Sequence, residues 1–165
     1  MKYELVKTDN KNFVGVTLYR VKALRSFGNV SVGDLGGYIE GEKNLSHSGD
    51  AWVYGDARVY GNAMVYGDAM VSGDASVYGD SSVYGDAIIK KSSDYIIIGP
   101  AKSSGRFTTA FVDSEIGVRV DCGCFTGTVL EFSKQIEETH ANNQEALEQY
   151  RLFCQLIAFN FGVKA

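Results

Sequence analysis

Apolar and polar positions alternate with a fixed six-residue period between Gly49 and Lys90. The chain repeats one phrase seven times without a gap: GDAWVY, GDARVY, GNAMVY, GDAMVS, GDASVY, GDSSVY and GDAIIK. A small residue stands third and an aliphatic residue fifth, which is the alternation of a strand that sends one set of side chains inward. Since a unit this short cannot fold alone, successive units must stack into a solenoid with a shared core.

Each phrase is predicted to supply one short strand and one corner. The predicted core is the aliphatic residue of each copy: Val53, Val59, Val65, Val71, Val77, Val83 and Ile89. The glycine and the acidic or amide residue after it mark the corner, because glycine tolerates positive φ and aspartate hydrogen-bonds local backbone. The aspartates will also stack, and capping of the corners explains them better than binding of Ca²⁺, for which the calcium-binding nonapeptide is absent.

The phrase resembles the hexapeptide repeat of left-handed parallel β-helix proteins, in which about three hexads close one triangular coil. The resemblance alone implies the left hand, since connections between parallel strands are ordinarily right-handed. The period reaches back to Leu45, but the step from Leu45 to Val53 is eight residues, which predicts a two-residue bulge around His47 and Ser48. A similar skip follows Ile89, and the solenoid is predicted to span residues 36–103.

The segments on either side of the repeat predict a cap and a mixed C-terminal part. Residues 3–6 and 13–24 read as two strands separated by the loop TDNKN, and they would cap the open coil end. Residues 106–112 and 118–121 predict a hairpin, followed by helices over about 128–140 and 142–161. The expected fold is mainly β, with a cap (1–35), a hexapeptide β-helix (36–103) and a β-hairpin with two helices (104–165).

Two apolar surfaces predict self-association. Residues eighteen apart should lie above one another on a coil of three hexads, so Trp52, Met70 and Ile88 would share one outer face. An exposed apolar face of this kind usually marks a contact. The last helix is apolar around most of its circumference, including Phe153, Leu156 and Phe159. We expect these six residues at an oligomer interface, and the resemblance implies a trimer rather than a dimer.

Composition limits the cellular compartments and the classes of partner that fit the chain. The 165-residue chain has a net charge of -4 and 45% hydrophobic residues, which is enough for a core. Its first residues contain no apolar signal region, no run could span a bilayer, and the three cysteines form no disulfide framework. We therefore expect a cytoplasmic protein that binds no membrane. Scattered basic residues disfavour a broad nucleic-acid surface.

Candidate catalytic residues are few. The resemblance implies, for acyltransferases of this type, a histidine base and acyl-coenzyme A along the coil, and the chain has only His47 and His140. His47 is the candidate base if the protein is an acyltransferase, and acetyl-coenzyme A would then be its cofactor. Two histidines cannot supply the three zinc ligands of a γ-class carbonic anhydrase. Cys122 and Cys124 with His140 lack the usual spacing of structural zinc ligands. We expect no metal and no cofactor.

The favoured interpretation is a non-catalytic binding or scaffold protein. Tyrosines recur at the end of most phrases and offer broad contact area with a polar tip, as binding surfaces often do. The predicted binding residues are Tyr54, Arg58, Tyr60, Tyr66, Tyr78 and Tyr84. The whole chain resembles short hexapeptide proteins of bacteriophages and prophages, which implies an accessory role: binding a host protein or sequestering a small ligand, with interference in host defence as one outcome. The alternative is a hexapeptide acyltransferase.

Overall fold

The computed structural model describes residues 1–13 and 15–165, and the side chains of residues 1–7 and 15–165. The chain divides into two compact units, Met1–Ser92 and Ser93–Ala165, and each is described by itself. None of the helices in the described residues is long and apolar enough to cross a bilayer.

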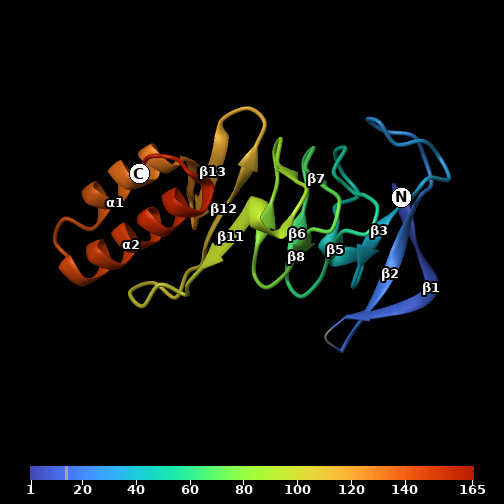
Figure 1. Ribbon diagram of the computed structural model, residues 1–165, viewed down its shortest axis with the longest axis horizontal. Coiled ribbons are helices and arrows are strands. Elements are labelled where there is room, and N and C mark those ends of the chain that lie inside the picture. Colours follow the sequence, from blue (N-terminus) through green and yellow to red (C-terminus); the bar gives the residue numbers. More distant parts are fainter. Residues whose placement is uncertain (14) are drawn as a thin grey trace. The chain divides into compact units, whose positions relative to one another are not determined.

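The repeat forms a solenoid in the first unit. Each phrase contributes one two-residue strand: β4 (Trp52–Val53), β5 (Arg58–Val59), β6 (Met64–Val65), β7 (Met70–Val71), β8 (Ser76–Val77), β9 (Ser82–Val83) and β10 (Ile88–Ile89). Strands three phrases apart pair in parallel, so that β7 lies between β4 and β10, β5 pairs with β8, and β6 pairs with β9. The stacked coils are visible in Figure 1. The eighteen-residue stacking predicted from the sequence is therefore present.

The inward residues make a narrow core of small and aliphatic side chains. The aliphatic residue of every phrase is at most 1% exposed, and so is the small third residue. Ser81 takes that third place in one phrase, and its hydroxyl donates to the carbonyl oxygen of Tyr78 at 2.9 Å. A hydroxyl is tolerated here because a local carbonyl satisfies it.

The corners are held by contacts between successive coils. The backbone N–H of Asp50 donates to Oδ1 of Asp68 at 3.1 Å, and Asn62 Nδ2 donates to Oδ1 of Asp80 at 2.9 Å. In both pairs the acceptor is the corner carboxylate one coil further along. The sequence predicted bonds from these side chains to local backbone, whereas in these two pairs the corner carboxylate joins one coil to the next.

The predicted bulge is present at the start of the solenoid. Ile39 pairs with Val59, and Leu45 bridges Val65, so each partner lies twenty residues away instead of eighteen. A short 3-10 helix, η1 (Glu42–Asn44), lies between them. The fully buried Asn44 donates its side-chain amide to the carbonyl oxygens of Ala63 at 2.8 Å and Gly61 at 3.1 Å. This side chain fastens the irregular first coil to the next one.

Three strands cap the open coil end. β1 (Tyr3–Phe13) and β2 (Val16–Ala23) pair antiparallel, β2 pairs antiparallel with β3 (Leu35–Ile39), and β3 joins β5 in parallel. The predicted loop TDNKN is instead part of β1, which runs on to Phe13 with a register shift between Val6 and Lys11. Figure 1 shows the hairpin beyond the first coil. The free backbone edge of β3 is thereby covered, as a solenoid end requires.

The cap buries Trp52, which changes one prediction. The indole is 1% exposed, and it makes edge contacts with the rings of Phe27 at 5.3 Å and Tyr3 at 6.2 Å between centroids. Trp52 is thus covered by its own chain, and the expectation that it lies on a free intersubunit face is not met. Met70 and Ile88, in register with it, are half-buried.

The second unit is an antiparallel sheet with two helices. Its strands, in spatial order, are β11 (Tyr95–Ile98), β12 (Thr108–Asp113), β13 (Gly117–Cys122) and β14 (Phe125–Thr128). A 3-10 turn, η2 (Ser92–Asp94), precedes β11. The sequence placed residues up to 103 in the solenoid, but β11 pairs antiparallel with β12. Among the described residues, the parallel ladder ends at Ile89, and the apolar run around Ile97 belongs to the sheet.

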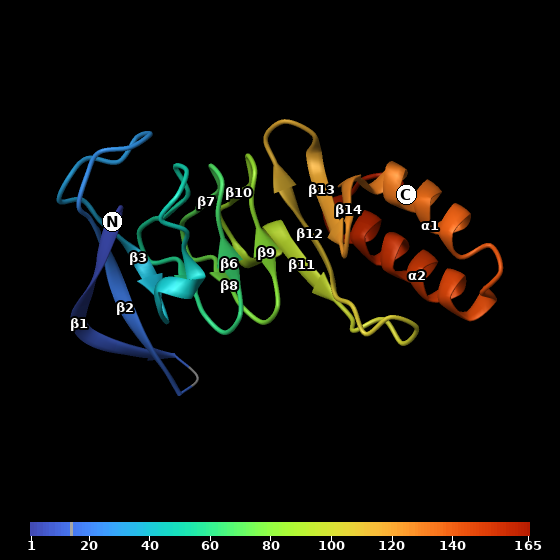
Figure 2. The ribbon, with the colours of Figure 1, turned by 180° about the vertical axis from the view of Figure 1, so that it is seen from behind.

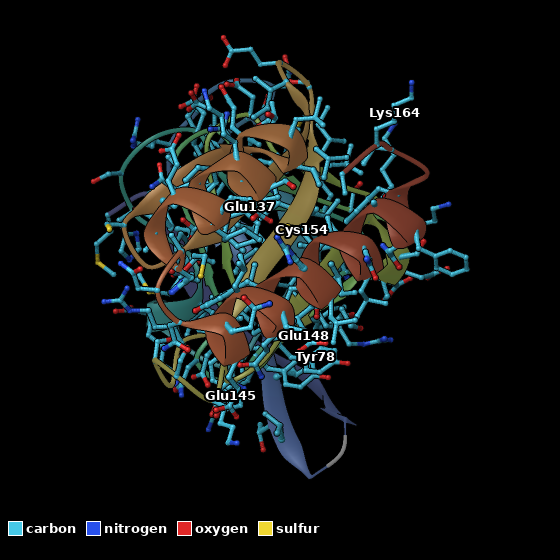
Figure 3. The ribbon with its side chains drawn as sticks, turned by 90° about the vertical axis from the view of Figure 1, so that its left-hand side faces the viewer. Tyr78, Glu137, Glu145, Glu148, Cys154 and Lys164 are labelled. Carbon is cyan, nitrogen blue, oxygen red and sulfur yellow. The ribbon has the colours of Figure 1, made fainter. Side chains whose placement is uncertain are left out.

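The two predicted helices are present with their predicted ends. Thr128 caps α1 (Val129–Thr139) in a reciprocal capping box with Glu131, Asn143 caps α2 (Gln144–Phe161), and Gly162 ends α2 in the left-handed conformation. Both helices lie on the same side of the sheet (Figure 2). Their core residues are Val129, Phe132, Ile136, Leu147, Tyr150, Phe153, Cys154 and Ile157. Cys154 lies between the helices (Figure 3), where burial raises the pKa of its thiol to about 11 and keeps it protonated.

Candidate functional site

The corner tyrosines of the solenoid form two stacked pairs. The rings of Tyr60 and Tyr78 lie 5.3 Å apart between centroids with an interplanar angle of 11°, and those of Tyr66 and Tyr84 lie 4.9 Å apart at 9°. Each pair is eighteen residues apart, so it occupies the same corner on successive coils. The coil repeat of about 4.8 Å places equivalent side chains at nearly the distance at which aromatic rings pack.

Arg58, Tyr60 and Tyr78 together make a surface that we call the tyrosine face. Tyr78 is 47% exposed, whereas Tyr60 and Arg58 are half-buried. Burial, and then the neighbouring Tyr78, raise the pKa of Tyr60, while Arg58 acts in the opposite direction. The phenol of Tyr60 therefore stays neutral and can donate or accept a hydrogen bond at physiological pH.

The tyrosine face continues toward the cap. Arg58 stands in register with Tyr38 on one side and with Ser76 on the other. The guanidinium of Arg20 lies 5.5 Å from the ring centre of Tyr38, and its Nε donates to the carbonyl oxygen of Gly36 at 2.9 Å. Tyr38 is itself only 7% exposed, so on this side the two arginines flank a largely buried tyrosine. Both residue types are enriched at the centres of protein interfaces.

Tyr54, another predicted binding residue, lies outside the stacked pairs. The residue one coil above it is Ser72, so no ring is available for it to stack on. Burial, followed by the carboxylates of Asp34 and Asp50, raises the pKa of Tyr54. The sequence grouped Tyr54 with the other tyrosines, but the structure gives it different neighbours.

His47 is held between the cap and the solenoid. Its Nδ1 accepts the backbone N–H of Lys2 at 3.2 Å, and its ring stacks on Tyr3 at 4.2 Å between centroids with an angle of 20°. Nε2 is buried and has no hydrogen-bond partner among the described residues. A neutral imidazole whose Nδ1 accepts a hydrogen bond carries its proton on Nε2. In this arrangement neither nitrogen is free to accept a proton from a substrate.

A cavity of about 480 Å³ adjoins His47. It is lined by η1, by the segment Leu45 to His47, and by the outer side of β6, including Met64 and Tyr66. The volume is sufficient for a small ligand. The Nδ1 of His47, however, already accepts a hydrogen bond from the backbone N–H of Lys2.

Lys2 is a buried cation beneath the cap. Its side chain is fully buried, and Nζ donates to the carbonyl oxygens of Ala51 at 2.8 Å and Gly49 at 3.4 Å, 5.0 Å from the ring centre of Phe27. Burial, reinforced by the charge of Arg25, lowers the pKa of Lys2 to about 8, although Asp50 and Asp68 oppose this. These contacts give Lys2 a structural role in attaching the cap.

The second unit contains a further cavity, of about 340 Å³, that we call the C-terminal pocket. Cys122, Cys124 and His140, which the sequence analysis weighed as zinc ligands, all line it. In the described part of the chain, however, no three His, Cys, Asp or Glu side chains are grouped closely enough to hold a metal ion. Cys122 instead accepts a hydrogen bond from the hydroxyl of Thr108 at 3.3 Å.

The predicted interface residues of α2 divide between its two sides. Phe153 is 9% exposed and packs in the core of the second unit, so it is not on a free surface. Leu156 is 45% and Phe159 88% exposed, and Leu152, which precedes them by one and two turns, is 59% exposed. These three residues form a continuous apolar stripe on the outside of α2. The sequence predicts one apolar stripe along this helix through Leu147, Tyr150, Cys154 and Ile157, and these four residues are buried, whereas the assignment of Phe153 to the interface is wrong.

Sequence reasoning did not single out the C-terminal pocket. Tyr150 read as part of the apolar stripe of a helix, and Arg106 as the start of a strand. In the structure the Arg106 side chain lies against Gly123, whose φ is +65° and whose missing Cβ leaves space for it. A glycine between two cysteines gives no hint of the distant residue that packs on it.

Comparison with known families supports the reading of the repeat. The family described as YdcK Beta solenoid repeat matches residues 51–67, 57–73 and 65–79. The repeat segment is a β-solenoid. The matched residues cover β4 to β8 and the corners between them, which include the tyrosine face. No curated protein matches the chain.

Proposed function

We propose that this protein is a non-catalytic binding module whose tyrosine face contacts a protein partner. The observation that carries the proposal is the stacked Tyr60–Tyr78 pair beside Arg58, with Tyr78 47% exposed. Stacked rings on a rigid solenoid lose little conformational entropy on binding, and tyrosine and arginine side chains commonly dominate interface energies.

The geometry of His47 supports a binding role over an acyltransferase role. A base must offer a free lone pair to the acceptor hydroxyl or amine of the substrate. Nδ1 of His47 already accepts from Lys2, and its ring is stacked on Tyr3 under the cap. The acyltransferase alternative would require His47 to break that contact before it could act.

The biological setting of the proposal comes from the resemblance to short hexapeptide proteins of phages and prophages. We infer a left-handed solenoid in a homo-oligomer, with a trimer as the favoured state, acting in the bacterial cytoplasm on a host protein. Interference with a host defence would be its consequence. The exposed stripe of Leu152, Leu156 and Phe159 supports self-association, because apolar side chains at this spacing are rarely left in water. Light scattering should give about three times the 18.0 kDa chain mass.

The binding proposal is tested by capture from bacterial lysate with matched baits. The Tyr60→Ser and Tyr78→Ser double variant removes both rings and introduces the residue that already ends another copy of the phrase, Ser72, so the coil should fold. The control is Tyr66→Ser with Tyr84→Ser, which removes the other stacked pair. A protein retained by the wild type and by the control, but lost by the first variant, supports the proposal. Retention by all three baits contradicts it.

The acyltransferase alternative is tested by calorimetric titration with acetyl-coenzyme A. The binding proposal expects no saturable heat with the wild-type protein at millimolar ligand. Saturable binding that His47→Ala leaves intact, together with acyl transfer that His47→Ala abolishes, would establish the enzyme and refute the binding module.

A further inference from the structure

The C-terminal pocket has the size and the position of a small-molecule site. Its volume of about 340 Å³ lies within the range of ligand pockets. The loop before β12, the β13–β14 turn and both helices contribute to its walls, so four segments distant in sequence converge there. It lies entirely within the second unit and shares no residue with the tyrosine face.

The walls of the pocket are aromatic and already ordered, with Phe125 and Phe132 tilted by 39° and Phe132 and Tyr150 edge to face at 90°. The ring of Phe132 lies 5.1 Å from that of Phe125 and 6.2 Å from that of Tyr150, and His140 stacks on Tyr150 at 5.0 Å with an angle of 11°. Phe132 and Tyr150 are 2% and 4% exposed, so the protein core fixes their positions. Walls of this kind favour a planar apolar body, which can stack on them without reorganising the site.

The charge of the pocket is positive although the chain is acidic overall. The residues that line it include Arg106 and no carboxylate, in a chain of net charge -4. Three other cations of this unit have acidic partners: Lys102 with Glu145, Arg119 with Asp113, and Arg151 with Glu137. Among the described residues, the guanidinium of Arg106 has no such carboxylate.

Arg106 is also held in place. Its side chain lies across Gly123, where an added Cβ would come within 2.8 Å of Nη1 and 3.2 Å of Cδ. The carbonyl oxygen of Arg106 accepts the N–H of Ala101 at 2.7 Å, and its own N–H donates to the Ser104 hydroxyl at 3.2 Å. The cation is therefore directed along the β13–β14 turn at the rim of the pocket, where it can meet an anion.

Hydroxyl groups complete the polar part. Tyr150 Oη and Ser104 Oγ lie 3.0 Å apart, and both residues line the pocket. Burial raises the pKa of Tyr150, so its hydroxyl remains a donor at neutral pH. One of these hydroxyls donates to the other, so one O–H remains, beside the guanidinium, to donate to an oxygen of a carboxylate or a phosphate.

We propose that the C-terminal pocket binds a small planar aromatic anion, with its ring against Phe125, Phe132 and His140 and its carboxylate or phosphate on Arg106. Serine and tyrosine hydroxyls at the same rim complete the anion site. This site is independent of the tyrosine face, so either can be present without the other. A ligand here gives the second unit a sensing or sequestering role of its own.

The test is a titration of the full chain with benzoate and with phenyl phosphate, in which binding is measured from NMR chemical-shift changes. Benzylamine, a cation of similar shape, is the control ligand. Saturable binding of either anion, with shifts centred on Phe125 and His140, is expected, and the two anions show which headgroup the rim prefers. Benzylamine should not bind. Failure of both anions to bind at millimolar concentration, or binding of benzylamine with equal affinity, would overturn the proposal.

Two exposed cationic side chains, one at the pocket and one away from it, allow a test variant and a matched control. Arg106→Gln removes the rim cation and should weaken anion binding tenfold or more, because a charge-assisted bond becomes a neutral one. Lys134→Gln removes an exposed cation of α1 that is not part of the pocket, and it should change the affinity by less than twofold. Circular dichroism establishes that both variants are folded. Equal affinities for Arg106→Gln and the wild type would place the anion elsewhere and refute the site.

Discussion

Substituting alanine at two equivalent corners tests how closely the coils stack. Gly55 and Gly67 open the second and the fourth copy of the phrase and have nearly the same backbone, with φ of +60° and +69°. A Cβ on Gly67 would lie 2.9 Å from the backbone nitrogen and 3.4 Å from Cα of Gly85 on the next coil, whereas a Cβ on Gly55 would meet nothing within 4 Å. The two substitutions therefore share the backbone strain and differ in the collision.

The expected costs follow from these contacts. Placing alanine at positive φ costs about 1–2 kcal/mol at either position. At Gly67 the backbone of the neighbouring coil must also move, and forcing an extra methyl group into packed structure costs about 1–3 kcal/mol more. Gly67→Ala should thus destabilise the protein by about 2–5 kcal/mol in total, and Gly55→Ala by about 1–2 kcal/mol.

Urea unfolding followed by circular dichroism measures both costs. For a chain of this length a difference of 1 kcal/mol corresponds to about 2–4 °C in Tm, so thermal unfolding gives an independent check. The slope of the urea transition should be unchanged, because neither variant alters the area buried on folding. Equal destabilisation by the two substitutions, or a larger effect at Gly55, would refute the stacking of Gly67 under Gly85.

Three further outcomes are expected. Val71→Asp should abolish folding, because it loses about 1.5–3 kcal/mol of burial and adds an unpaired charge to the core. Met64→Asp, at a residue that is 50% exposed, should leave Tm nearly unchanged. Equal Tm shifts would show that the assignment of inward and outward positions in the repeat is wrong. Because Lys2 has a folded pKa of about 8 against 10.5 unfolded, stability should rise with pH between them, by at most about 3 kcal/mol. Urea titrations up to about pH 9.5 should show this rise in the wild type and not in Lys2→Met. Asp113→Asn should cost about 1–3 kcal/mol by weakening the bond from Arg119 Nε at 2.7 Å, and the exposed Glu115→Gln should cost almost nothing.

The repeat could be predicted well because its fold depends on local periodicity. Seven copies in one phase determine which side chains point inward. The length of one coil follows because each phrase stacks on the phrase three copies further along the chain. The helix ends could be predicted equally well, since capping depends on residues close in sequence. Thr128 and Glu131 cap the start of α1, and Gly162 ends α2.

The predictions from sequence failed where the structure depends on contacts between different segments of the chain. The apolar run around Ile97 has the composition of another coil. It forms β11 instead, because β12, a later strand that the repeat pattern does not report, pairs with it antiparallel. Trp52 was predicted to be exposed because the residues that cover it, Tyr3 and Phe27, come from the N-terminal cap, which is distant in the sequence. The C-terminal pocket is assembled from four separate segments, and no periodic signal in the sequence reports such convergence.

The most direct test of the binding account uses the captured partner in purified form. Isothermal titration should be run with the wild type, with the Tyr60→Ser and Tyr78→Ser double variant, and with His47→Ala. The account predicts that the double variant binds at least tenfold more weakly, because aromatic anchors dominate interface energy, and that His47→Ala stays within about twofold of the wild type. Loss of binding or activity in His47→Ala with the double variant unaffected, while both remain folded, would contradict the account and favour the enzyme.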